Sequence, residues 1–186
     1  MILDNYLLFT GTSNGASGGI TAGANTDLPT TGTQNASNIV DLGVSSGIPS
    51  SASGGGARDI GIGDDPSMKL LVQVVTTFGG GTDLYCLLAG APDNGSGSPG
   101  SYTTMWQQAA AVAEANLIAG TQLANVDVPR VVAGQAIPRF LRLTFVSTGT
   151  HTSGAVEGCI VLDRSDQIAG TTGALSGYPA GVNIAN

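Results

Sequence analysis

Residues 68–78 read Met-Lys-Leu-Leu-Val-Gln-Val-Val-Thr-Thr-Phe, and this stretch decides the fold class. It is rich in β-branched side chains, which pack well on a pleated strand and lose rotamer freedom in a helix. It contains no glycine or proline, so it predicts one uninterrupted strand. Gly79-Gly80-Gly81 follows, and Leu84–Ala89 is apolar again. We therefore expect 68–78 and 84–89 to pair as an antiparallel hairpin across the glycine turn.

Further short strands are expected on both sides of this pair. Phe140–Val146 alternates with a period of two, which places Leu141, Leu143 and Phe145 on the predicted core face. Residues 108–118 (QAAAVAEANLI) are the one expected helix, because they are rich in alanine. Roughly seven or eight strands separated by Gly/Pro turns predict an all-β fold, a jelly-roll-like antiparallel β-sandwich with long Gly/Ser/Thr-rich arms. The other expected strands are 39–42, 58–63, 102–107, 121–128 and 155–162.

The composition supports strands and turns and indicates an assembly. The chain of 186 residues holds 29 glycines but only 10% charged residues, against about 25% in a typical soluble domain. A surface with so few charges is typical of a protein that partners cover, although Ser, Thr, Asn and Gly could also solvate it. The formal net charge of −7 excludes a general nucleic-acid binder, because phosphate contacts need Lys and Arg.

The chain is expected to be one domain with three parts. Residues 1–57 form an N-terminal arm and loops with a short strand near 39–42, residues 58–169 form the β-sandwich core, and residues 170–186 form an irregular tail. The Gly/Ser/Thr/Asn-rich part, 10–38, has too few large apolar residues to order alone, so we expect it to order against a partner.

No signal peptide or membrane span is expected. The first residues include an aspartate and no basic residue, and no apolar run approaches the length of a span. Cys86 and Cys159 lie in apolar strand-like runs and are predicted to be buried, reduced thiols.

The residue patterns for catalysis are weak. His151 is the one histidine, it lies in a Thr-His-Thr-Ser-Gly turn, and we expect it to be an exposed or interface loop residue. Gly95-Ser96-Gly97-Ser98 imitates a nucleophile elbow but does not join a strand to a helix. One histidine and two separated cysteines do not form a zinc cluster.

The acidic and glycine pairs have simpler interpretations than ligand binding. Asp64-Asp65, Asp93-Asn94, and Asp163 with Asp166 offer oxygens that calcium accepts, but each pair also caps turns. Gly54–Gly56 and Gly61–Gly63 lack the Gly-Lys-Ser/Thr of a phosphate loop. We therefore assign no catalytic, cofactor-binding or metal residue, and we expect a protein that is not an enzyme and needs no cofactor.

Six stretches are distinctive in their order along the chain: Phe9–Gly15, Gly54–Pro66, Gly90–Ser96, Ser101–Thr103, Pro138–Leu143 and Gly173–Gly181. Together they resemble the tailed-phage capsid cement (decoration) proteins of the Bbp16 type. The resemblance implies a jelly-roll homotrimer on the outer capsid surface of the virion, bound to the major capsid protein. From the net charge and the lack of a long apolar run we expect neither nucleic acid nor a membrane as a partner. The resemblance also implies that the protein clamps neighbouring capsomers against internal pressure and has no catalytic residues. Because no signal peptide is expected, we expect synthesis in the host cytoplasm.

Two other functions stay open at this point. A carbohydrate- or host-receptor-binding jelly roll would need an exposed aromatic platform, for which Tyr102 and Trp106 are the candidates, although both are expected in the core. A hydrolase would depend on His151 alone.

Overall fold

The computed structural model describes residues 7–11, 26–43, 68–129 and 138–162. Within these ranges the regular secondary structure is almost entirely β-strand, which confirms the predicted all-β sandwich. One short 3-10 helix, η2 (Glu114–Asn116), interrupts it. The strands are β1 (Gly32–Asp41), β2 (Met68–Gly80), β3 (Asp83–Ala91), β4 (Thr103–Gln107), β5 (Val112–Ala113), β6 (Gln122–Asp127), β7 (Phe140–Thr148) and β8 (His151–Leu162).

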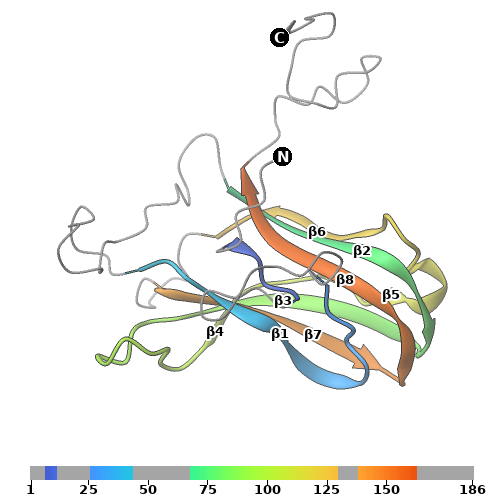
Figure 1. Cartoon of the computed structure of the whole chain (residues 1–186), viewed down its shortest axis with the longest axis horizontal. Helices are drawn as coiled ribbons and strands as arrows, with labels where there is room; N and C mark the ends of the chain where they lie inside the picture. The colour runs from blue at the N-terminus through green and yellow to red at the C-terminus, as the bar shows by residue number, and fades with distance from the viewer. Residues whose placement is uncertain (1–6, 12–25, 44–67, 130–137, 163–186) are drawn as a thin grey trace, which may run out of the picture.

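The strands form two antiparallel sheets that lie face to face (Figure 1). One sheet has the order β1-β7-β3-β4, with β5 also paired to β3, and the other has the order β6-β2-β8. The chain changes sheet between β1 and β2, between β2 and β3, and then at each step from β5 through β6 and β7 to β8. Such crossing connections are typical of jelly rolls and Greek keys and differ from a ladder of hairpins.

The predicted hairpin between β2 and β3 is wrong. β2 pairs with β6 and β8, while β3 pairs with β4, β5 and β7, so the glycine turn carries the chain from one sheet to the other. Gly80 and Gly81 have φ of 84° and 103°, a conformation that glycine adopts without strain. A period-two pattern defines the inward face of each strand, but it does not say whether two successive strands pair or face each other.

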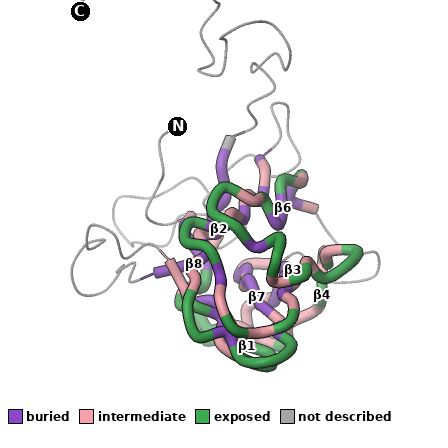
Figure 2. The backbone as a smooth tube through the Cα atoms, turned by 90° about the vertical axis from the view of Figure 1, so that its right-hand side faces the viewer, coloured by how far each residue is buried: buried purple, intermediate pink, exposed green. Residues whose placement is uncertain are grey.

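The core lies between the sheets and consists of alternate side chains from facing strands. β2 contributes Leu70, Val72 and Val74, each 0% exposed. Leu141, Leu143 and Phe145 of β7 are at most 1% exposed, which confirms the predicted core face of that strand. Figure 2 shows buried positions along the strands and many exposed positions on the turns between them.

The predicted helix at 108–118 is also wrong. Strand β5 and helix η2 occupy this segment, and the backbone bonds to neighbouring strands: Gln108 N donates to Cys86 O, and Glu114 N donates to Thr82 O. Its alanines lack the apolar stripe that anchors an amphipathic helix, and Leu117 is the buried side chain of the segment. Tertiary hydrogen bonds therefore outweigh helix propensity here.

β1 is longer than the predicted strand at 39–42, because it begins at Gly32 and pairs with β7 along most of its length. Residues 26–38 of the expected arm therefore belong to the folded sandwich. The expected strand at 58–63, the boundaries at 57/58 and 169/170, and the whole tail at 170–186 lie outside the described residues. No helix in the described part is long and apolar enough to cross a membrane.

Candidate functional site

Two N-terminal segments join the edges of the two sheets. Phe9 N donates to Gly158 O of β8 at 2.8 Å, and Asn38 N of β1 donates to Phe9 O at 2.8 Å. Further along, Asp27 and Val156 exchange two backbone hydrogen bonds of 2.9 Å. The segment 7–11 thus fills the gap between strands of different sheets and covers backbone groups that an open edge would expose.

We call segment 7–11, together with the strand edges of β1 and β8 that it joins, the seam, and its side chains are mostly buried. Phe9 is 0% exposed and belongs to the main core, although it lies far from the other core residues in sequence. Thr10 Oγ1 accepts a hydrogen bond of 2.8 Å from Gly158 N, which satisfies a buried backbone donor. Part of the predicted arm is therefore a structural element of the sandwich.

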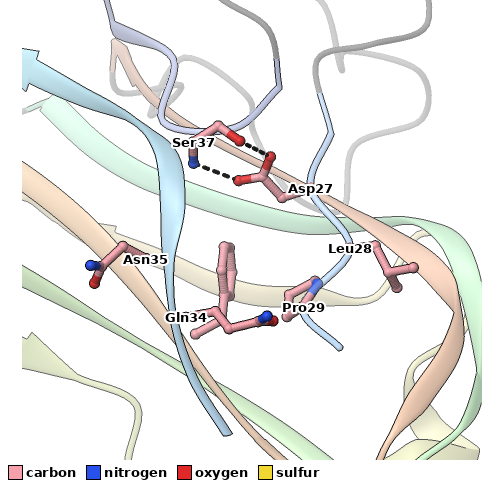
Figure 3. A pocket seen from close by; sticks show the side chains of 7 residues that line it. Asp27, Leu28, Pro29, Gln34, Asn35 and Ser37 are labelled. Carbon is pink, nitrogen blue, oxygen red and sulfur yellow. Dashed lines mark hydrogen bonds between the residues drawn. The ribbon is translucent and has the colours of Figure 1, made fainter. Parts of the chain in front are cut away.

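A pocket of about 300 Å³ lies beside this seam, between the segment 26–29 and β1 (Figure 3). Asp27 is its charged group, and its Oδ1 accepts from Gly11 N at 3.0 Å and from Ser37 Oγ at 2.6 Å. Its Oδ2 accepts from Ser37 N at 2.8 Å. The carboxylate is therefore used to hold the seam together. The lining residues are Asp27, Leu28, Pro29, Gln34, Asn35, Ser37 and Phe145.

The pocket lacks the aromatic platform of a typical sugar site. Its one ring, Phe145, is 1% exposed. The two predicted platform residues are elsewhere: Trp106 is partly buried against the core, and Tyr102 stacks with Arg142. The expected core position is thus confirmed for Trp106, whereas Tyr102 lies on the outer face of the five-stranded sheet.

Arg139 closes one end of the sandwich as an ionic clamp. Its Nε and Nη2 donate to the two carboxylate oxygens of Asp41 at 2.9 and 3.0 Å, and its Nη1 donates to Asp93. This fork connects the end of β1, the turn after β3 and the residue before β7. A guanidinium suits such a bidentate contact because its donors are planar and always charged.

The clamp changes the titration of its partners. Burial raises the pKa of Asp41, but hydrogen bonds from Arg139 and Gly43 N and the charge of Arg139 outweigh it, so the pKa lies below its ordinary value. Backbone hydrogen bonds from Gly97 and Gly95, followed by Arg139, lower the pKa of Asp93. These bonds also confirm the prediction that Asp93 caps its turn.

A second arginine, Arg142, stacks on the ring of Tyr102. It lies on the outer face of the five-stranded sheet, beside Ala89 of β3, and its guanidinium carbon is 3.8 Å from the centre of the Tyr102 ring. Its Nε and Tyr102 Oη are enclosed without a hydrogen-bond partner. Burial raises the pKa of Tyr102, and the charge of Arg142 opposes this.

His151 is buried, which overturns the expectation of an exposed or interface loop residue. Its side chain is 1% exposed, and its ring lies edge-on to Phe78 with centroids 4.9 Å apart. Nε2 is 3.2 Å from the backbone oxygen of Asp83, so Nε2 carries the proton and Nδ1 has no partner. Among the described residues it contacts neither a serine hydroxyl nor a carboxylate. The turn at Gly81 and the ring of Phe78 enclose this histidine, and the sequence pattern around residue 151 alone does not predict these contacts.

The cysteines behave as predicted. Both are free and buried, and burial raises the pKa of Cys86 to about 12. The same cause, with the charge of Glu157, raises the pKa of Cys159 to about 12. Thiols with such pKa values are poor nucleophiles at neutral pH.

The remaining sequence candidates divide into two groups. Gly95-Ser96-Gly97-Ser98 lies in the loop before β4 and does not join a strand to a helix. The glycine groups at 54–56 and 61–63 and the acidic residues Asp64, Asp65, Asp163 and Asp166 lie outside the described residues. Within the described ranges no group of three or more His, Cys, Asp or Glu side chains is close enough to hold a metal ion.

Sequence patterns did not single out Asp27, Arg139 or Arg142. A signal existed only for Arg142, since the alternation of 140–146 places a cation opposite the core face. The other two depend on neighbours that are ten to about a hundred residues away in the chain.

These features define an antiparallel β-sandwich protein in which Asp27 and Arg139 tie segments that are distant in the chain together. The Bbp16 family model matches residues 27–160, more than two thirds of the chain and nearly all of the sandwich. The chain therefore belongs to the Bbp16 family, whose name is associated with bacteriophages. No curated protein matches it.

Proposed function

We propose that this protein is a structural virion protein that forms a homotrimer and binds the outer capsid surface. It contacts the major capsid protein, bridges neighbouring capsomers and stabilises the shell against internal pressure. It performs no catalysis. The match to a phage-associated family over nearly all of the sandwich is the observation that carries the proposal.

The fold supports this function because it is a stiff, interlocked body. Strands distant in sequence share one core, an N-terminal segment joins both sheets, and Arg139 ties three segments together. A bridge that resists expansion of a shell needs such rigidity. The negative net charge also suits the outer surface, away from packaged nucleic acid.

The outer face of the five-stranded sheet supports binding to other proteins. Its cross-strand rows include partly exposed Tyr85, Leu87 and Val146, together with Ile39, which is 47% exposed. Among the described residues, Arg142 is the charge on the central part of this face, where its neighbours Ala89, Phe140 and Thr144 are buried and Ile39 is exposed. Flat surfaces with aromatic and aliphatic residues around an arginine are typical of protein interfaces.

Co-sedimentation with DNA-free shells of the phage's own major capsid protein tests the function. Saturable binding, together with shells that open at a higher temperature when the protein is bound, is the expected result. No binding at a protein concentration of about 10 μM, corresponding to an affinity weaker than about −7 kcal/mol, would contradict it. A glycan screen run on the same preparation tests the carbohydrate-binding alternative, for which the polar pocket beside β1 is the site to examine.

A further inference from the structure

Two surfaces of the described chain have unmatched charges of opposite sign. Three cations are described, and two of them are ion-paired: Lys69 with Asp127 at 3.0 Å, and Arg139 with Asp41 and Asp93. Arg142 has no carboxylate partner among the described residues, although it is half-buried and belongs to an acidic chain. Its stacking on Tyr102 holds the guanidinium against the sheet.

The complementary surface is the alanine-rich segment 109–119. It presents seven exposed apolar residues, of which Ile118 is 54% exposed. Glu114 is its only charge, and no cation pairs with it in the described part of the chain. Exposed apolar side chains around one carboxylate match an arginine whose cross-strand neighbour Ile39 is exposed. The exposed residues are Ala109, Ala110, Ala111, Ala113, Ala115, Ile118 and Ala119.

The two surfaces cannot meet within one chain. Ala113, beside Glu114, pairs with Asp83 at the start of β3, whereas Arg142 pairs with Ala89 further along the same strand. Six residues of strand separate these positions by about 20 Å, well beyond the reach of an ion pair. In Figure 1, β5 accordingly lies at the end of the sandwich away from the β4 label.

We propose that segment 109–119 of one copy docks on the Arg142 face of a second copy, with Glu114 paired to Arg142. Each copy carries both surfaces, so the contact is heterologous and closes into a ring when the rotation between copies permits it. The occupant is a second copy of this chain because the matching surface is present on the chain itself. The inference rests on the self-association in the proposed function and assigns its contact.

Charge reversal with rescue tests the contact. The oligomeric mass of the full chain is measured by light scattering over a dilution series for the wild type, Arg142→Glu, Glu114→Arg and the double variant. Each single variant should weaken self-association by roughly ten- to a hundredfold, because it places like charges together, and the double variant should regain the wild-type mass. Lys69→Glu is the matched control: it makes the same change in net charge on the other sheet and should leave the mass unchanged.

The outcomes separate this contact from the proposed function. The proposed contact would be overturned if the wild type were a monomer or if the single variants kept the mass of the wild type. The capsid role would then still be tested separately by binding to shells. Singles that lose shell binding but keep their mass would assign the Arg142 face to another protein and also overturn the inference. Circular dichroism spectra that match the wild type establish that each variant is folded.

Discussion

The substitution Phe9→Ala tests whether segment 7–11 is a packed part of the sandwich or a loose N-terminal arm. Phe9 is 0% exposed in the main core, and its backbone bonds to strands of both sheets. If residues 7–11 were an arm, Phe9→Ala would be nearly neutral. If the segment is part of the sandwich, the change leaves a cavity among side chains that are already packed at the density of a crystal.

The magnitude follows from the burial. A fully buried Phe→Ala change costs about 3–5 kcal/mol, a large part of the roughly 5–15 kcal/mol of a whole domain. With a urea m-value of about 2 kcal/mol/M, the midpoint should fall by about 1.5–2.5 M. The melting temperature should fall by about 6–20 °C for a chain of this size.

Urea unfolding followed by circular dichroism at one fixed protein concentration measures this change, since self-association makes stability concentration-dependent. Val75→Ala is the control, because Val75 is 44% exposed and its truncation should cost less than about 0.5 kcal/mol. A loss below about 1 kcal/mol for Phe9→Ala would refute the seam.

Three further predictions concern the turns, the clamp and the thiols. Gly81→Ala should lower the melting temperature more than the control Gly95→Ala. Both glycines have positive φ, but an added Cβ at Gly81 would meet the His151 ring at 2.3 Å, whereas the space at Gly95 is open. Equal losses of melting temperature would exclude the ring contact as the cause. Between about pH 6 and about pH 2.5, the urea midpoint of Arg139→Gln should fall less than that of the wild type. Asp41 and Asp93 have pKa values lowered in the folded state, so they stabilise the fold above their ordinary pKa of 3.8 and lose this effect as pH falls through the folded pKa. Parallel pH profiles of the two proteins would contradict the role of Arg139. Cys86 and Cys159 should react with a disulfide reagent such as dithionitrobenzoate only after urea is added. Rapid labelling of the native protein would contradict their burial.

The sequence by itself determined the fold class and the inward face of the best strands. β-Branched runs and period-two alternation are local properties, so residues 68–78 and the core face of 140–146 could be predicted from the chain alone. The same holds for the buried cysteines, which lie in apolar strands, and for the turn capped by Asp93.

Only the tertiary structure decided which strands pair and which polar groups meet. β2 and β3 lie in different sheets, segment 108–118 bonds to neighbouring strands instead of coiling, and His151 is enclosed by turns from other strands. The seam at Phe9 and the ion pairs of Arg139 likewise join residues far apart in the chain. These features depend on long-range contacts, whose free energy comes from packing and hydrogen bonds between segments, and a local pattern records the propensity of each segment but not its partner.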